Sequence, residues 1–278
     1  MTLIQVILLH CAVSFLTDFS EAKLDQQTSI RLDKQKIHDM VFLSKNTLLL
    51  STDERKLTLV DSRSSQVLSE MELQAKPLFM CTAGPHLAAT TLERKTIQFI
   101  QVNANKQMRC TTLQVDVDVY GIAAYRNNFV ISYYLPGVKI ISKTGAMIHK
   151  LENTTTGREV FRNPRRIAIT PDDSIYVADW GTNEITRLDS NLAILQTFSV
   201  DMLQFPSGFI ALNRDQLLVC SRDNNRILLL RPSTSSMTVI LNKQHGIERP
   251  QSVCFCKKQK KLYVSSDSDG RVLVYQML

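Results

Sequence analysis

The stretch PRRIAITPDDSIYVADWGTNEITRLD, residues 164–189, has a simple internal order: proline, an apolar run, an acidic turn, an apolar run, a polar turn and another apolar run. The same order recurs downstream in FPSGFIALNRDQLLVCSRDNNRILLLRP (residues 205–232) and RPQSVCFCKKQKKLYVSSDSDGRVLVYQ (residues 249–276). Weaker copies begin at Asp39, Lys76 and Val119. The chain therefore contains six related units.

The spacing of these units identifies the architecture. The second apolar run of each unit begins at intervals of 39 to 46 residues, and the equivalent first residues are Leu48, Leu87, Phe129, Ile175, Leu217 and Leu262. A period near forty is typical of propeller blades. The runs are short, rich in Val, Ile, Leu, Phe and Tyr, and bounded by turn residues, which indicates strands rather than helices. The sequence predicts an all-β, six-bladed β-propeller that fills residues 18–278 as one domain.

The last unit ends one strand short of a complete blade. Two segments before the first unit can replace that strand: residues 18–24 (DFSEAKL) and residues 28–32 (TSIRL). Because closing the ring would remove exposed sheet edges, we expect an N-terminal strand to complete the sixth blade.

The fourth unit carries a family resemblance. NPRRIAITPDDSIYVADWGTNEITRLD and DNNRILLL resemble NHL repeats, and the six units together resemble the C-terminal propeller of tripartite-motif (TRIM-NHL) proteins. The resemblance is weakest in units one to three, where LLST, AATT and ISYY replace YVAD. It implies a non-catalytic binding platform for protein or RNA.

The cysteines and histidines bear on the other parts of that family. None of the six cysteines forms a Cys-x-x-Cys motif, and no heptad stretch is present, so we expect no RING, B-box or coiled coil and no ubiquitin ligase activity. Cys254 and Cys256 lie two apart on a predicted strand, and we interpret them as small core residues rather than metal ligands. No metal site and no cofactor are predicted.

The predicted inner strands argue against catalysis. They begin DMVFL, LFMCT, GIAAY, RIAIT, GFIAL and SVCFC, which are almost wholly apolar. No phosphate-binding glycine loop and no nucleophile elbow is present. We therefore expect that the protein is not an enzyme, with a lactonase-like or lyase-like propeller as a minor alternative.

The charge of the chain bears on its partners. A formal net charge of +7 suggests an acidic partner, either a protein or RNA. Charges of both signs are nearly balanced on the face formed by the loops between second and third strands and between blades. The opposite face is basic because of KKQKK at residues 257–261. This balance favours a protein partner over RNA; neither a DNA sequence reader nor a membrane span is expected, and the chain is expected to be a monomer.

One long connection is the best candidate for a binding loop, because long loops on rigid scaffolds often carry function. It joins units three and four, and the adjacent loop of unit four contains the only tryptophan. Trp180 is either an exposed stacking group or packs against the next blade. Asp179 is expected to accept hydrogen bonds from turn amides. The predicted partner-binding residues are Arg158, Phe161, Arg162, Arg165, Arg166 and Trp180, with Arg222 and Arg226 in the matching loop of unit five.

Residues 1–17 form an apolar N-terminal segment that is too short to span a bilayer. Ser20 and Ala22 follow at positions that a signal peptidase would favour, so the segment is a possible signal peptide or an alternative start. Three features oppose secretion: no basic residue precedes the apolar run, cleavage after Ala22 would cut the candidate closing strand, and an odd number of cysteines would remain. We expect a cytoplasmic protein, with secretion as the alternative.

Overall fold

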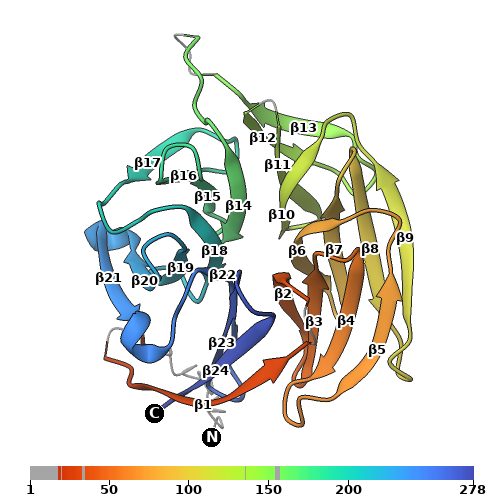
Figure 1. Cartoon of the computed structure of the whole chain (residues 1–278). Helices are drawn as coiled ribbons and strands as arrows, with labels where there is room; N and C mark the ends of the chain where they lie inside the picture. Colours follow the sequence, from red (N-terminus) through yellow and green to blue (C-terminus); the bar gives the residue numbers. More distant parts are fainter. Residues whose placement is uncertain (1–17, 20, 33–34, 135, 154–156) are drawn as a thin grey trace, which may run out of the picture.

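Six four-stranded antiparallel sheets surround a central axis in the computed structural model (Figure 1). The structure describes residues 18–19, 21–32, 35–134, 136–153 and 157–278. The all-β, six-bladed propeller predicted from the repeat is therefore confirmed. The apolar N-terminal segment, residues 1–17, lies outside the described residues.

Each blade takes its strands in chain order from the axis outward, except the last. Blade one consists of β2 (Ile37–Ser44), β3 (Thr47–Thr52), β4 (Lys56–Asp61) and β5 (Val67–Glu72). Blade two consists of β6 (Pro77–Gly84), β7 (Leu87–Leu92), β8 (Thr96–Val102) and β9 (Met108–Gln114). Blade three consists of β10 (Val119–Tyr125), β11 (Asn128–Tyr133), β12 (Gly137–Ile141) and β13 (Met147–Leu151). Blade four consists of β14 (Pro164–Ile169), β15 (Ile175–Asp179), β16 (Glu184–Leu188) and β17 (Ile194–Phe198). Blade five consists of β18 (Pro206–Ala211), β19 (Leu217–Ser221), β20 (Arg226–Arg231) and β21 (Ser236–Leu241). Blade six consists of β22 (Pro250–Cys256), β23 (Lys261–Ser266), β24 (Arg271–Met277) and β1 (Leu24–Arg31). Short 3-10 turns cover Pro232–Thr234 and Lys243–His245.

Burial of the second strand of each blade explains why the repeat could be recognised in the sequence. Every residue of β3, β15 and β19 is buried, because neighbouring blades cover both faces of these strands. A strand covered on both sides has no solvent-facing positions, so its sequence is a continuous apolar or small-residue run. The residues used to measure the period lie at the first or second position of the second strand in all six blades.

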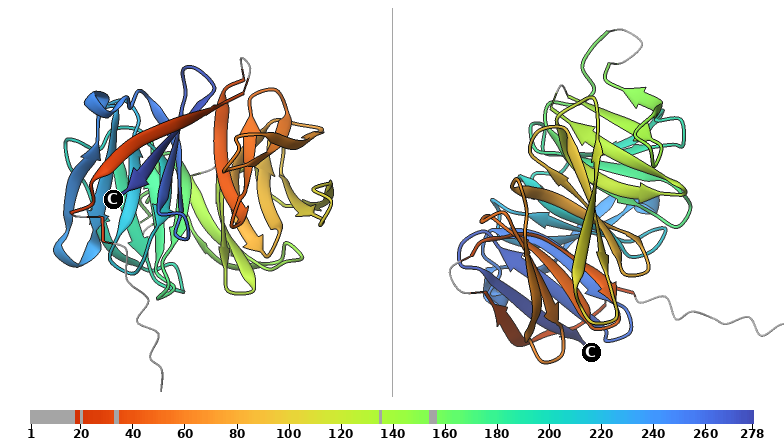
Figure 2. Two further views of the ribbon diagram at one scale, coloured as in Figure 1. Left: turned by 90° about the horizontal axis from the view of Figure 1, so that it is seen from below. Right: turned by 90° about the vertical axis from the view of Figure 1, so that its right-hand side faces the viewer.

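An N-terminal strand closes the ring. β1 pairs antiparallel with β24, from Leu24 opposite Met277 to Arg31 opposite Arg271. Figures 1 and 2 show this first strand lying against the last blade of the chain. The predicted closure is confirmed, and the closing strand overlaps both of the candidate segments.

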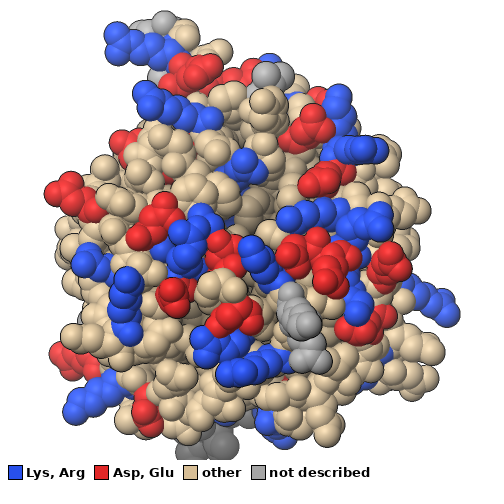
Figure 3. All heavy atoms as spheres, viewed as in Figure 1, with Lys and Arg blue, Asp and Glu red and all other residues tan. Residues whose placement is uncertain are grey.

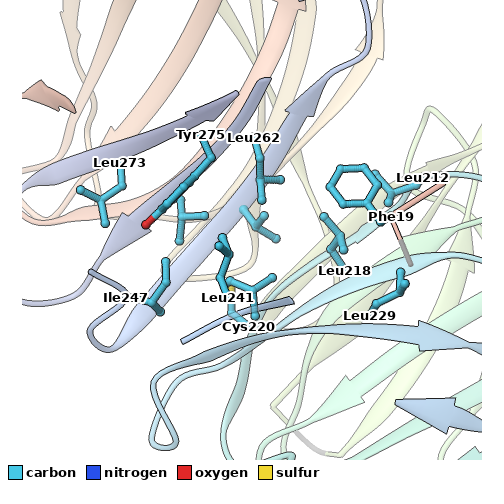
Figure 4. Packing of buried hydrophobic residues seen from close by; sticks show 13 residues of the cluster. Phe19, Leu212, Leu218, Cys220, Leu229, Leu241, Ile247, Leu262, Leu273 and Tyr275 are labelled. Atoms are coloured by element: carbon cyan, nitrogen blue, oxygen red, sulfur yellow. The ribbon is translucent and has the colours of Figure 1, made fainter. Parts of the chain in front are cut away.

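Phe19, which precedes β1, packs into the hydrophobic core. Its side chain is buried between blades five and six in a cluster with Leu212, Leu218 and Tyr275 (Figure 4), and its ring meets that of Phe255 edge to face at 4.9 Å. Because β1 begins after Ala22, cleavage at that point would leave the closing strand intact and would remove Phe19 instead. The expectation that cleavage would cut the closing strand is wrong. Among the described residues, no helix is long and apolar enough to cross a membrane.

We predict that Ile30→Ala weakens the closed ring. Ile30 is 1% exposed and packs with Tyr263, Val272 and Val274 of the last blade. Removing its side chain should lower the free energy of unfolding by about 2–5 kcal/mol in chemical denaturation. The exposed neighbour Thr28 provides the control, since Thr28→Ala should change it by less than about 0.5 kcal/mol. Equal effects of the two changes would contradict a role for β1 in stability.

Candidate functional site

A buried ion pair occupies the axis of the propeller. Asp39 of β2 and Arg166 of β14 are 2% and 6% exposed, and Asp39 Oδ2 lies 2.5 Å from Arg166 Nη1. The Asp39 carboxylate also accepts hydrogen bonds from the Met80 amide at 2.7 Å and from Ser252 Oγ at 2.7 Å. The pair therefore joins blades one and four, and its carboxylate additionally contacts blades two and six.

The Arg166 guanidinium uses its remaining donors on the same inner strands. Nε donates to the Ser207 carbonyl, and Nη2 donates to the carbonyls of His38 at 3.3 Å and Gln251 at 3.4 Å. The guanidinium also lies 4.2 Å from the centre of the Phe79 ring. A charge this deeply buried is tolerated because each of these partners replaces lost water. Five of the six blades contact this one pair.

The neighbouring arginine belongs to a different arrangement, which we name the arginine–aromatic row: Tyr120, Arg165, Trp180, Phe205 and Arg222. The Arg165 guanidinium lies 3.4 Å from the Tyr120 ring centre and 4.9 Å from that of Trp180. The Trp180 and Phe205 ring centres are 4.1 Å apart, and Arg222 lies 4.7 Å from the Phe205 ring. All five side chains are half-buried. The row runs across blades three, four and five at the end of the channel where their first strands begin.

Trp180 is fixed at one edge. Its Nε1 donates to the Pro206 carbonyl at 2.8 Å, in addition to the stacking against Phe205. The side chain therefore packs against the next blade while remaining partly accessible, which combines the two alternatives drawn from the sequence. Fixing the indole in this way lowers the conformational entropy that a partner would have to remove on binding.

Asp179 holds the loop from which the row projects. It is 1% exposed, and its carboxylate accepts from the amides of Arg162 at 2.7 Å, Asn163 at 2.9 Å and Gly181 at 2.7 Å. The predicted role of Asp179 in turn hydrogen bonding is confirmed. Its additional bonds to the amides of residues 162 and 163 fix the end of the connection between blades three and four.

The structure separates the predicted partner-binding residues into three groups. Arg158 and Arg162 are exposed, whereas Arg226 is half-buried at the start of β20. Phe161 is 1% exposed within the core between blades three and four, and Arg166 lies in the channel, so neither is presented on the surface. The remaining three, Arg165, Trp180 and Arg222, come together in the arginine–aromatic row.

Sequence reasoning did not single out four residues of this region: His38, Asp39, Tyr120 and Phe205. Asp39 is the lone acid that opens an otherwise apolar inner run, DMVFL, and that isolation was the available signal. Tyr120, Arg165 and Phe205 all stand beside or within the first residues of an inner strand, so aligning the units on these positions would have grouped them.

Acids accompany the arginines on the same face. Asp267 pairs with Arg222 and, at 3.4 Å, with Arg249, and Asp223 lies 3.9 Å from Arg249. Figure 3, which looks onto this face, shows basic and acidic side chains interspersed around its centre. The face therefore offers alternating charges rather than a uniform basic field.

His38 lies beside the channel mouth. Burial lowers its pKa from the ordinary value to about 4, with further lowering from the positive charges of Lys76 and Arg166, so the ring is neutral at pH 7. Its Nε2 is buried and has no hydrogen-bond partner among the described residues.

No group of His, Cys, Asp or Glu in the described part of the chain has an arrangement that could hold a metal ion. Cys254 and Cys256 are both 6% exposed and pack with Tyr263 in the core, as predicted for small core residues.

Comparisons with known proteins identify the fold. Three similar solved structures are a catalytically inactive variant of virginiamycin B lyase from Staphylococcus aureus with quinupristin, the selenomethionine-substituted form of virginiamycin B lyase from Staphylococcus aureus, and a streptogramin B lyase. In that order, their TM-scores are 0.64, 0.65 and 0.65, and their sequence identities to this chain are 15%, 14% and 12%. The matches cover 93%, 93% and 92% of this chain and 100%, 100% and 98% of the solved chains. The chain thus shares its six-bladed architecture with these lyases over nearly its whole length.

The comparisons by sequence give no family. No protein-family model matches the chain, and no curated protein matches it.

The expectation that the protein is not an enzyme is contradicted by the structural neighbours, which are lyases. That expectation rested on the apolar inner strands. An apolar channel does not exclude catalysis at the channel mouth, where side chains from the loops and strand ends converge. At these identities the likeness establishes the fold, and function has to be argued from the site.

We predict that Arg166→Met destabilises the ring strongly. Removing one member of a buried ion pair leaves Asp39 uncompensated, which should lower the free energy of unfolding by about 3–5 kcal/mol in urea. The double change Asp39→Leu with Arg166→Met should recover much of that loss. Arg162→Met, at an exposed position, is the matched control and should be nearly neutral. A single Arg166→Met variant as stable as the wild type would contradict the structural role of the pair.

The lowered pKa of His38 predicts a pH dependence of stability. As pH falls from about 6.5 to about 4, the unfolded chain takes up a proton at this histidine before the folded chain does. The contribution is therefore fully present above pH 6.5 and is lost as pH falls through that window. His38→Gln should make the free energy of unfolding less dependent on pH between about 4 and 6.5. His149→Gln, at an exposed position, should not change that pH dependence.

Proposed function

We propose that the protein is a macromolecular binding platform whose partner, a protein, docks on the face that carries the arginine–aromatic row. The observation that supports this most directly is the row itself. Arginine, tryptophan and tyrosine are enriched among residues that dominate binding energy at interfaces, and here they are already ordered by one another. The resemblance to the target-recognition propellers of TRIM-NHL proteins supports the same function.

The charges of this face favour a protein partner over RNA. Asp267 and Asp223 accompany Arg222 and Arg249 at the row's end, so part of the positive charge is already compensated. Binding to nucleic acid gains most of its affinity from cations that replace the counterions of phosphates. A surface with paired charges of both signs suits a complementary protein surface better.

An RNA-binding propeller remains the second possibility on this face. It is supported by the exposed Arg162 and by the half-buried Trp180, which can combine phosphate contacts with base stacking. The cytoplasmic compartment and the monomeric state predicted from the sequence stay predictions.

A capture experiment with matched variants tests the proposal. Tagged wild-type protein, a variant with Arg165→Ser and Trp180→Phe, and a variant with Lys257, Lys258, Lys260 and Lys261 changed to Ser are incubated with native extract, with and without nuclease. We expect a discrete protein partner that survives nuclease, is lost about tenfold or more with the row variant, and binds the lysine variant normally.

Two outcomes would contradict this assignment. Loss of all captured material after nuclease would favour RNA. Binding that survives in the row variant and disappears in the lysine variant would place the interface on the opposite face. Melting temperatures of all three proteins must agree, because Trp180 also supports the neighbouring blade.

A second candidate function is catalysis at the same mouth. It is supported by the fold that the chain shares with the lyases, and the half-buried His38 beside the mouth is the residue to test. Incubation with quinupristin, followed by chromatography, tests it: consumption by the wild type and none by His38→Ala would support it. Equal behaviour of both proteins would oppose it.

A further inference from the structure

A cleft opens between blades two and three, away from the arginine–aromatic row. It has a volume of about 420 Å³, and its edges include the start of β7 and the turn between β12 and β13. These segments lie at the opposite end of the blades from the starts of the inner strands, where the row is found. Volumes of this size are in the range of small-molecule sites, roughly 300–1,000 Å³.

The walls of the cleft are apolar and come from both blades. Phe99 of β8 and Phe129 of β11 face each other with ring centres 5.3 Å apart and an interplanar angle of 47°. Leu87 and Ala83 extend this surface on blade two. Phe129 is 4% exposed, whereas Phe99 and Leu87 are half-buried and so accessible from the cleft.

The register of blade two places a cation at the edge of this apolar surface. Leu87 pairs with Gln101, and Gln101 pairs with Arg109, so these three side chains form one row across β7, β8 and β9. Phe99 pairs with Thr111 two residues further on and therefore faces the same side of the sheet. The Gln101 amide nitrogen donates to the His86 carbonyl at 3.2 Å, which fixes the middle of the row.

Blade three supplies a second cation. Lys143 lies in the turn between β12 and β13, which is held by two hydrogen bonds: the Ser142 amide donates to the Ala146 carbonyl at 2.8 Å, and the Ala146 amide donates to Ser142 Oγ at 3.1 Å. Arg109 and Lys143 are both exposed, line the cleft, and have no ion-pair partner among the described residues. None of the described residues that line the cleft is acidic.

We propose that this cleft binds a small apolar carboxylate from solution, such as an aromatic acid. Its body packs against Phe99 and Leu87, and its carboxylate is held by Arg109, with Lys143 adding positive charge from the other blade. A guanidinium can hold a carboxylate through two parallel hydrogen bonds. The combination of aromatic walls with two uncompensated cations fits this class of ligand through charge complementarity.

Binding of 2-naphthoate to the full chain tests the proposal, with the neutral 2-naphthamide as the matched probe. Calorimetry should show tighter binding of naphthoate than of naphthamide. Arg109→Gln and Lys143→Gln should each weaken naphthoate binding about two- to fivefold, as expected for exposed ion pairs, and should leave naphthamide binding unchanged. Lys257→Gln, on the same face but outside the cleft, is the control and should bind as the wild type does.

A blocking variant shows whether the probe occupies the cleft. Thr111 is exposed beside Phe99, so Thr111→Trp should fill the space and abolish binding of both probes without lowering the melting temperature. Three results would each overturn the proposal: equal affinities for the two probes, normal binding to Thr111→Trp, or no binding of naphthoate at 1 mM. A dissociation constant of 1 mM corresponds to a binding free energy of about −4.1 kcal/mol. Tighter binding of N-acetyl-Glu-Phe-amide than of naphthoate would also overturn it, because the occupant would then be a protein segment.

Discussion

The ion pair between Asp39 and Arg166 imposes a single constraint on five of the six blades: two charges can be buried on the axis only when the surrounding blades supply their hydrogen-bond partners. The carboxylate takes an amide from blade two and a hydroxyl from blade six, and the guanidinium takes carbonyls from blades one, five and six. Displacing any of these five blades would remove a partner of one of the charged groups. The pair therefore selects the arrangement of the blades as well as contributing to their packing.

The same constraint explains the candidate binding face. The β14–β15 pairing shifts register between Pro164 and Arg166, so Arg165 has no partner in the ladder. Arg166 lies in the channel, whereas the Arg165 guanidinium lies over the Tyr120 ring. Asp179 then fixes the preceding residues through the amides of Arg162 and Asn163. The arginine–aromatic row is thus positioned by buried polar groups beneath and beside it, which is how a rigid scaffold keeps binding side chains ordered.

The sequence was informative where a pattern repeats and uninformative where distant segments meet. The period of the second strands predicted the blades, and the missing outer strand predicted β1, because both follow from local hydrophobic patterning. The positions of Phe161 and Arg166 depend on how the strands converge at the axis and between blades, and the partner of Arg166 lies in a blade far away in the chain. Four arginines near one another in sequence were therefore separated in space. The inner strands also misled the prediction about catalysis, since apolar channel walls do not describe the groups at the channel mouth.

The closing strand also has a consequence for biosynthesis. β1 is translated before all the other strands of the propeller and its partner β24 after them, so the contact between them encloses the other five blades. Such long-range pairings form slowly, because the intervening segment must first be ordered. Until the last blade emerges from the ribosome, Ile30 and the edge of β1 have no partner, and the nascent chain exposes a strand that other chains can pair with. The contact that closes the ring is therefore also the point at which synthesis is most vulnerable to misassembly.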